Sequence, residues 1–328
     1  MNNSCSTPSL RCHSRASGNP FFLLGLALVL CVASLQPAAA QTSSKPAPLK
    51  DDLGHEVRLP AYPARIVSLA PSNTEVLFAL GLEKRIVGVT SYCDYPPEAR
   101  QKTLIGTYND PSLEKIVSLK PDLVLAAHGN PIELVAELEK LRIPVFSVNP
   151  KTLNDALRNI RMIGALTGRD GEAAALIVSI NARIAAVSDR TRRLPASQRP
   201  RVLFVGGWQP PFFTPGPGTV VNDLIDLAGG RNVAADAPKQ TWVQYGLETL
   251  VAKAPDVVMT TYVTGEDPRV RAVDAQKTLK EMDGWRTMPA VRQGRICYLF
   301  ADAIFRPGPR LVDALEEMAR CLHPEMFQ

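Results

Sequence analysis

Residues 113–126 read LEKIVSLKPDLVLA, and residues 247–260 read LETLVAKAPDVVMT. The two stretches share leucine, glutamate, valine, proline, aspartate and valine at matching places. In each stretch the proline ends a helical segment, because it cannot donate a helical hydrogen bond, and the apolar residues that follow suit a buried parallel strand. Any α/β protein can repeat such a helix–strand unit, but the unit does not require the shared glutamate, which is Glu114 in one copy and Glu248 in the other. The repeat predicts two α/β lobes built alike.

The chain around both copies alternates between short apolar runs and helical segments. The strand-like runs are RIVSLA (65–70), RIVGVT (85–90), RIPVFSV (142–148), RVLFVGG (201–207) and RICYLF (295–300). Strands that alternate with helices predict a parallel sheet with helices on both faces. Ser72 stands three residues before Glu75, and this spacing predicts a capping box that opens the first helix.

One long segment between the two halves, residues 171–194, has no internal glycine or proline. Its apolar stripe at helical spacing consists of Ile177, Ile180, Ile184 and Val187. We therefore expect an α/β protein in which two Rossmann-like lobes with parallel-sheet cores are joined by one long rigid helix. The expected division is a signal peptide at 1–40, an N-terminal tether and edge strand at 41–64, an N-terminal lobe at 65–168, the interlobe helix at 169–195 and a C-terminal lobe at 196–328.

The N-terminus has the pattern of an export signal. Residues 21–35 form an apolar run, and the small residues at 38–40 offer a cleavage site near Ala40. The run is short for a membrane span, which needs about 20 apolar residues. An uncleaved anchor is the alternative, whereas a lipoprotein anchor at Cys31 is disfavoured by the bulky Leu30 before it. The sequence predicts an exported protein.

The charge balance and the motif search narrow the functional class. The chain has 37 basic and 32 acidic residues, a formal net charge of +5, which argues against nucleic-acid binding. It contains no G-x-S-x-G elbow, no Walker loop and no C-x-x-C motif, and the HEVRL stretch at His55 lacks the second histidine of a zinc protease. We expect neither catalysis, nor a metal site, nor a resident cofactor.

The cysteines that follow the predicted signal peptide are Cys93, Cys297 and Cys321. An odd number leaves at least one thiol unpaired, so the chain is not a disulfide scaffold. Whether Cys297 pairs with Cys321 stays open at this point.

Over nearly all of residues 65–324 the chain resembles the substrate-binding proteins of ABC importers that have a single rigid helix between two lobes. The resemblance is carried by RIVSLAPSNTEVLFALG (65–81), VTSYCDYPPEA (89–99), SLEKIVSLKPDLVLA (112–126), AGGRNV (228–233), GLETLVAKAPDVV (246–258), VRQGRICYL (291–299) and RPGPRLVDALEEMARCLHPE (306–325). Members of this family bind cobalamin, haem or ferric siderophores. SYCDYPPEA and GLETL are most similar to the members that bind cobalamin.

Large aromatic residues follow strand ends or precede helices in both halves. Because ligands bind beyond the carboxyl ends of parallel strands, we expect these rings to line a ligand site for a flat, mostly apolar macrocycle. The alternative is that they fill the lobe cores, which we expect for Trp285. The predicted ligand-binding aromatic residues are Tyr92, Tyr108, Trp208, Phe212, Trp242 and Phe305.

Three polar residues join the predicted site. Asp302 and Arg306 flank Phe305 and offer an acceptor and a donor to amide groups on a corrin rim, whereas the carboxylates of haem prefer arginine alone. An Asp–Arg pair that only fixes the loop is the alternative. His128 follows a predicted strand and is either an axial metal ligand or a polar loop residue, and Arg310 is expected to open the next helix.

The resemblance assigns the shared glutamates a partner. In this family the corresponding glutamates, one on each lobe, contact arginines of the two permease subunits. Glu114 and Glu248 are therefore the expected transporter-docking residues. The alternative is that a glutamate in a first helical turn only stabilises the helix dipole, by about 0.3–1 kcal/mol.

Together these features predict a monomeric periplasmic protein that captures cobalamin between two lobes and delivers it to the permease dimer of an ABC importer in the inner membrane. Haem or a ferric siderophore is the alternative ligand. An exported α/β enzyme would need a nucleophile–base pair, which the sequence does not show. A purely structural surface protein would not need aromatic residues at strand ends.

Overall fold

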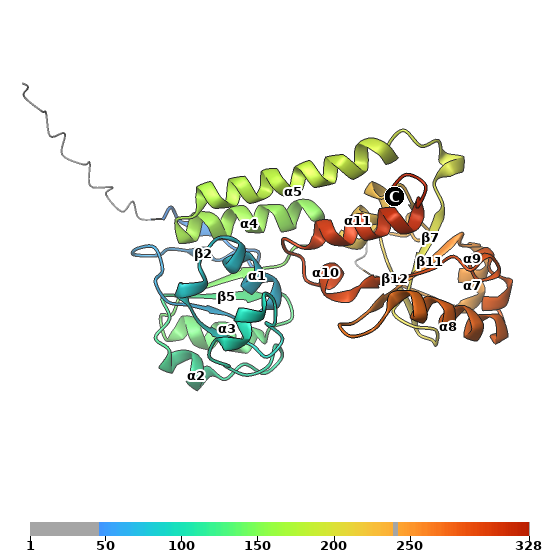
Figure 1. Ribbon diagram of the computed structural model, residues 1–328. Coiled ribbons are helices and arrows are strands. Elements are labelled where there is room, and N and C mark those ends of the chain that lie inside the picture. The colour runs from blue at the N-terminus through green and yellow to red at the C-terminus, as the bar shows by residue number, and fades with distance from the viewer. Residues whose placement is uncertain (1–45, 239–241, 328) are drawn as a thin grey trace, which may run out of the picture. The chain divides into compact units, whose positions relative to one another are not determined.

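The computed structural model describes residues 46–238 and 242–327 (Figure 1). The predicted signal peptide, residues 1–40, lies outside the described residues, as do residues 41–45 of the predicted tether.

The N-terminal lobe is built on a parallel sheet in the order β4-β3-β5-β6. Its strands are β3 (Ile66–Ser68), β4 (Ile86–Val89), β5 (Leu123–Ala127) and β6 (Val145–Val148). Its helices are α1 (Pro71–Ala79), α2 (Leu113–Ser118), α3 (Ile132–Lys140) and α4 (Leu153–Thr167), with short 3₁₀ turns at Glu83–Arg85 and Pro97–Gln101. Apolar cores lie on both faces of the sheet, as a parallel sheet requires.

The C-terminal lobe is built on a second parallel sheet in the order β12-β11-β7-β9. Its strands are β7 (Arg201–Phe204), β9 (Arg231–Asn232), β11 (Val257–Tyr262) and β12 (Ile296–Phe300). Its helices are α6 (Val220–Leu227), α7 (Leu247–Ala252), α8 (Pro268–Glu281), α9 (Pro289–Gln293), α10 (Ala301–Phe305) and α11 (Leu311–Leu322), with 3₁₀ turns at Ala196–Gln198 and Trp285–Thr287. When the strands of each sheet are numbered in chain order, both sheets have the order 2-1-3-4. The predicted pair of α/β lobes is confirmed.

The repeated Pro-Asp has the same structural role in both lobes. Lys120 and Ala254, which precede the prolines, both adopt left-handed backbone angles, with φ of 44° and 45°. The following aspartates then accept hydrogen bonds from the backbone at the start of the neighbouring strand: Asp122 from Arg65 N and Asp256 from Arg201 N, each at 2.8 Å. The motif ends one helix and sets the register of the strand that follows.

Helix α5 (Asp170–Thr191) runs from one lobe to the other beside α4 (Figure 1). Along its predicted stripe, Ile177 and Ile180 are buried in the N-terminal core and Val187 in the C-terminal core. Ile184, between them, packs against both cores. The apolar stripe of one helix therefore packs into the cores of both lobes.

The lobes also exchange core residues, which the sequence does not reveal. Leu153 and Ala156, from the start of α4, are buried in the C-terminal core. Val312, from the start of α11, is buried in the N-terminal core. The connection between the lobes is therefore made by three helices rather than by α5 alone.

Two local predictions are wrong. The residue that precedes α1 is Ala70, which makes no side-chain cap, and Pro71 occupies the first turn, where its missing N–H costs nothing. Glu75 does not reach back to that end of the helix, because its carboxylate is hydrogen-bonded to Arg310. The capping box is therefore not formed.

The edge strand expected within residues 41–64 does not join a lobe sheet. Strand β2 (Glu56–Val57) pairs only with β1 (Leu49–Lys50), in a separate antiparallel hairpin. Pro60 and Pro63 follow β2 and lack the N–H groups that would extend its ladder. A second small antiparallel sheet, β8 (Phe212–Pro215) with β10 (Trp242–Tyr245), was also not predicted.

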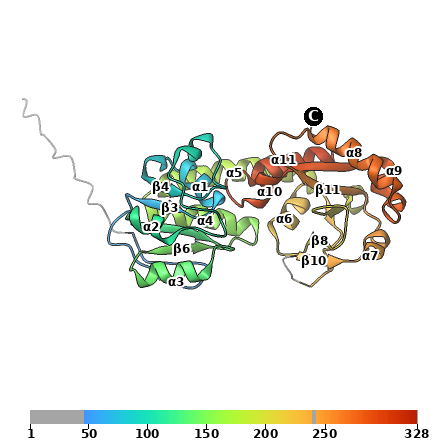
Figure 2. The ribbon, with the colours of Figure 1, turned by 90° about the horizontal axis from the view of Figure 1, so that it is seen from below.

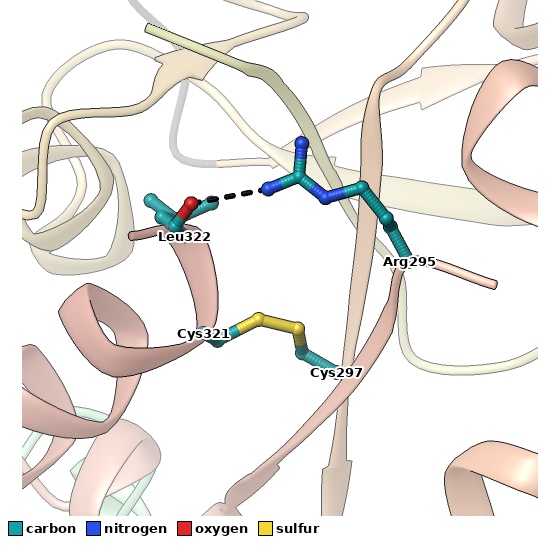
Figure 3. The surroundings of a disulfide bond; sticks show 4 residues. All are labelled: Arg295, Cys297, Cys321 and Leu322. Carbon is teal, nitrogen blue, oxygen red and sulfur yellow. Dashed lines mark hydrogen bonds between the residues drawn. A yellow bond between two sulfur atoms is a disulfide. The ribbon is translucent and has the colours of Figure 1, made fainter. Parts of the chain in front are cut away.

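Cys297 of β12 and Cys321 of α11 form a disulfide (Figure 3). Beside it, Arg295 donates to the backbone oxygen of Leu322 at 3.1 Å. Cys93 is a buried free thiol. The question that the sequence left open is thereby answered, and the disulfide ties the last helix to the edge strand of its own lobe.

Replacing Cys297 and Cys321 by serine should lower the free energy of unfolding by about 3 kcal/mol, because the cross-link closes a loop of 24 residues in the unfolded chain. Urea denaturation of the double variant checks this. Treating the unaltered protein with a reductant should produce the same loss, and treating the double variant should produce none. An unchanged urea midpoint would show that the cross-link contributes nothing to stability.

Candidate functional site

A cavity of about 570 Å³ opens between loops of the two lobes. Its N-terminal wall follows the carboxyl ends of the strands: Ala70 after β3, Tyr92 after β4, Ala127 at the end of β5 and Val148 at the end of β6. The opposite wall is formed by Trp242 and by residues 301, 302 and 305–307. Smaller hollows of about 330 and 440 Å³ adjoin it and share His128 and Asn149 with it. The position and the size are those of a small-molecule site.

Most of the residues predicted to bind a ligand line this cavity. They are Tyr92, Tyr108, His128, Trp242, Asp302, Phe305 and Arg306. Tyr92 is 55% exposed, Phe305 49% and Trp242 38%. The Trp242 and Phe305 ring centroids lie 6.4 Å apart, and both rings pack on the buried Phe204. Apolar ring surface is thus held open to solvent in the cavity and is available to a ligand.

Trp208 and Phe212 do not line the cavity, and their predicted place there is wrong. Phe212 is only 4% exposed, and its ring centroid lies 5.6 Å from that of Trp285. Trp208 packs edge-on against Trp285 at 5.5 Å and against Tyr298 at 6.4 Å. The reason is strand β8, whose alternation turns Phe212 into the core and Phe213 outward. Trp285 is fully buried, which confirms its predicted structural role.

Tyr108 and His128 meet at the N-terminal wall. The Tyr108 hydroxyl donates a hydrogen bond to the backbone oxygen of His128. Burial raises the pKa of Tyr108, so the phenol stays protonated and remains a donor. Gly129 has a φ of +98°, and a Cβ there would lie 2.9 Å from the Tyr108 oxygen, so only glycine fits. The His128 ring makes no hydrogen bond to another described residue, and His128 lines the cavity.

A cluster of ion pairs, two of whose members line the cavity, joins the lobes. Arg306 donates to Asp94 at 2.5 Å, and it lies 3.1 Å from Asp302 and 3.8 Å from Glu75. Arg310 contacts both oxygens of Glu75, at 2.5 and 2.8 Å. Asp94 and Glu75 come from the N-terminal lobe, and the other members come from the C-terminal lobe. The cluster is therefore an interlobe bond as well as part of the site.

The members of this cluster differ in their exposure. The Glu75 side chain is 2% exposed, and those of Arg310 and Arg306 are 11% and 13% exposed. Burial raises the pKa of Glu75, and the two arginines oppose that effect. The Arg310 guanidinium also lies 4.0 Å from the ring centroid of Tyr95, a cation–π contact. The Glu75 carboxylate thus depends on Arg310 for its charged form.

Three members of this cluster, Glu75, Asp94 and Arg310, were not predicted to lie at the site. Arg310 does precede α11, as expected, but its side chain turns to Glu75. Asp94 lies in the stretch 89–99, which carries the family resemblance. The one local signal was Glu75, an acid that directly precedes the apolar residues Val76, Leu77 and Phe78 of α1.

Glu114 and Glu248 lie at matching places in the two lobes. Both are exposed and stand in the first turn, of α2 and of α7 respectively. Neither makes a salt bridge to another residue in the part of the chain that the structure describes. Figure 2 shows α2 and α7 on different lobes. The two acids are available to a partner.

Comparison with known proteins places the chain among substrate-binding proteins. A family model described as periplasmic binding protein matches residues 66–303. An uncharacterized ABC transporter substrate-binding lipoprotein of Bacillus subtilis, YvrC, is 31% identical over 295 residues, covering 89% of this chain and 90% of that protein. A cobalamin-binding protein of Halobacterium salinarum is 31% identical over 289 residues, covering 87% of this chain and 76% of the relative.

A solved structure extends the comparison to a different ligand. The periplasmic heme-binding protein RhuT from Roseiflexus sp. RS-1, in apo form, superposes with a TM-score of 0.67 and 31% sequence identity, covering 79% of this chain and 98% of that one. The cobalamin-binding relative and the heme-binding neighbour are thus equally identical to this chain. Overall identity does not separate the ligands, so the chemistry of the cavity must do so.

Proposed function

We propose, from the premise that the chain belongs to the periplasmic binding protein family, that it captures a cobalamin in the cleft between its lobes and delivers it to an ABC importer. Substrate-binding proteins of this class work with ABC transporter permeases and are not enzymes. The protein acts as a monomer in the periplasm after its signal peptide is cleaved near Ala40, and it hands its ligand to a permease dimer in the inner membrane. The metal chelate is cargo rather than a resident cofactor.

The observation that carries this proposal is that the positive charge of Arg306 is already paired with carboxylates of the protein. It is the only lysine or arginine among the residues that line the main cavity, within the described part of the chain. Asp94 and Asp302 already hold it. A primary amide both donates and accepts, so it can bond to an arginine N–H and a neighbouring carboxylate at once. The corrin rim bears amides of this kind.

The aromatic residues supply the remaining binding energy. Tyr92 faces the cavity from the N-terminal lobe, and Trp242 and Phe305 face it from the C-terminal lobe. Large rings bury much apolar area and have few torsions to order, so they suit the faces of a macrocycle. A ligand held between them contacts both lobes.

Haem is the second candidate, and His128 is the observation that favours it. His128 lines the main cavity and both adjoining hollows, where an imidazole could coordinate a metal at the centre of a tetrapyrrole. Two features oppose this candidate. The carboxylates of haem find no uncommitted arginine among the described residues that line the main cavity, and the Tyr108 phenol is engaged as a donor to a backbone oxygen. A ferric siderophore with an anionic chelate would meet the same shortage of an uncommitted arginine.

Docking is assigned to Glu114 and Glu248. Their exposure and their matching places on the two lobes support contact with basic residues on the two halves of a permease dimer. A dipole role alone would not require the same acid at both places.

Calorimetric titration with cyanocobalamin, haemin and a ferric hydroxamate tests the ligand. We expect cyanocobalamin to bind at least about tenfold more tightly than the others, because one or two amide contacts each contribute about 1 kcal/mol. Tight binding of haemin without binding of cobalamin would replace this proposal by the second candidate.

A pair of ring variants serves as the control. Phe305→Ala removes a cavity ring and should weaken binding of cyanocobalamin about tenfold or more. Phe213→Ala removes a similarly exposed ring that does not line the cavity and should leave the affinity unchanged. Equal effects of the two variants would place the ligand elsewhere.

A further inference from the structure

We propose that Asp94 determines ligand specificity. Because Asp94 forms an ion pair with Arg306 of the other lobe, the arginine is not available to pair with ligands that carry carboxylates. The inference deepens the proposed function and rests on it, since it concerns the same cavity. Asp94 acts through Arg306 and is a positioning residue.

The geometry separates Asp94 from the groups that face the ligand. Asp94 lies on the loop after β4 of the N-terminal lobe and is not among the residues that line the cavity. Arg306 follows α10 of the opposite lobe and does line it. Their contact is the shortest that Arg306 makes, 2.5 Å, against 3.1 Å to Asp302. Asp302 comes from α10 and lines the cavity itself. Of the two acids that contact Arg306 from outside the lining, Asp94 is the nearer, since Glu75 lies 3.8 Å away and is paired with Arg310.

The charges of the cluster explain why this matters for specificity. Glu75, Asp94 and Asp302 surround Arg306 and Arg310, three carboxylates against two guanidinium groups. The second oxygen of Asp94 lies 3.6 Å from Arg100, whose side chain is 70% exposed and screened by water. A ligand carboxylate at Arg306 would add a further negative charge to a partly buried cluster that already has an excess of them. An amide adds no charge and meets no such repulsion.

The substitution Asp94→Asn isolates this effect. An asparagine oxygen in the same place can still accept from Arg306, so the guanidinium keeps its position but loses its nearest countercharge, while Asp302 and Glu75 remain. We expect the ratio of haemin affinity to cyanocobalamin affinity to rise about tenfold or more, because a hydrogen bond from an arginine released by Asp94 to a ligand carboxylate is charge-assisted. Titrations of both ligands against both proteins measure that ratio.

Two controls separate this role from a structural one. Haemin with its carboxylates converted to methyl esters should gain nothing from Asp94→Asn, whereas a loosened cleft would accept both forms better. Glu98→Gln makes the same change of charge at an exposed residue of the 3₁₀ turn that follows, and should leave the ratio unaltered. Adding Arg306→Gln to Asp94→Asn should abolish the gain, which excludes Arg100 as its source.

The outcomes distinguish the inference from the proposed function. If the unaltered protein binds cobalamin and Asp94→Asn leaves the ratio unchanged, or raises affinity for the acid and the ester alike, the role of Asp94 is wrong and the function stands. If the unaltered protein binds no corrinoid, the proposed function fails. In that case, if Asp94→Asn raises the affinity for free-acid haemin but not for its ester, the role of Asp94 is still supported. If it does not, the role of Asp94 and the proposed function are both wrong.

Discussion

Replacing Glu75 by alanine is expected to lower the free energy of unfolding by about 3–5 kcal/mol, the usual cost of removing one partner of a buried ion pair. The reason is Arg310. Its guanidinium makes both of its close carboxylate contacts with Glu75, at 2.5 and 2.8 Å, and its side chain is 11% exposed. Without Glu75 the positive charge stays in a poorly hydrated place beside Arg306, and repulsion between the two arginines adds to the loss.

Urea denaturation of Glu75→Ala measures this loss, and two further variants make the measurement specific. Glu114→Ala removes an exposed glutamate of the same lobe and should stay within about 0.5 kcal/mol of the unaltered protein. Replacing Glu75 and Arg310 together by methionine should recover most of the stability, because the pair then disappears without leaving a charge. If Glu75→Ala lowers the free energy of unfolding by less than about 1 kcal/mol, the charge of Arg310 is balanced by water or by the other carboxylates.

The position of this pair also bears on ligand binding. Glu75 lies on α1, directly after the loop that lines the cavity at Ala70, and Arg310 precedes α11, which inserts Val312 into the N-terminal core. The backbone of Gly308 runs close to that of Ser72, so a Cβ on Gly308 would lie 3.5 Å from the Ser72 oxygen. The lobes are therefore held together beside the cavity as well as along α5. We infer that the width of the cleft is set by both connections.

The sequence predicted the architecture because its main features are local. Alternating strands and helices, the Pro-Asp repeat and the stripe on α5 each depend on residues close together in the chain. The structure adds a reason for the repeat, since Lys120 and Ala254 share a left-handed turn that leads each aspartate to its neighbouring strand. A pattern of this kind can be found without knowing any tertiary contact.

The parts that could not be predicted depend on contacts between distant residues. Glu75 and Arg310 are 235 positions apart, and nothing near either one announces the other. The same holds for Asp94 with Arg306 and for Val312 in the opposite core. The misplaced Phe212 has a different cause: its strand β8 pairs with β10, which follows it after a long interval, so the segment resembles a loop when read alone. Local capping rules failed at Glu75 because α1 begins at Pro71, before Ser72, and because the Glu75 carboxylate is bonded to Arg310 of the other lobe.

The largest functional effect is expected from Glu114→Ala combined with Glu248→Ala, which should abolish uptake of the ligand by cells that depend on the cognate importer while leaving ligand affinity intact. Both acids are exposed in first helical turns, where each contributes about 0.3–1 kcal/mol to its helix. The double variant should therefore fold. Neither acid lines the cavity, so titration with the ligand should give the affinity of the unaltered protein. Uptake of labelled ligand and calorimetry on the same variant check the two halves of this prediction.

Matched acids show whether position or charge is responsible. Glu133→Ala combined with Glu281→Ala removes one exposed glutamate from each lobe, outside α2 and α7, and so changes the net charge equally. If electrostatic attraction to the permease were diffuse, both double variants would slow uptake alike, and the loss would shrink as salt is added. If Glu114 and Glu248 are specific contacts, only their removal stops transport, and either single variant leaves one lobe attached and uptake partly active. Weakened ligand binding with normal uptake would reverse the assignment, because it would place the two acids at the ligand rather than at the transporter.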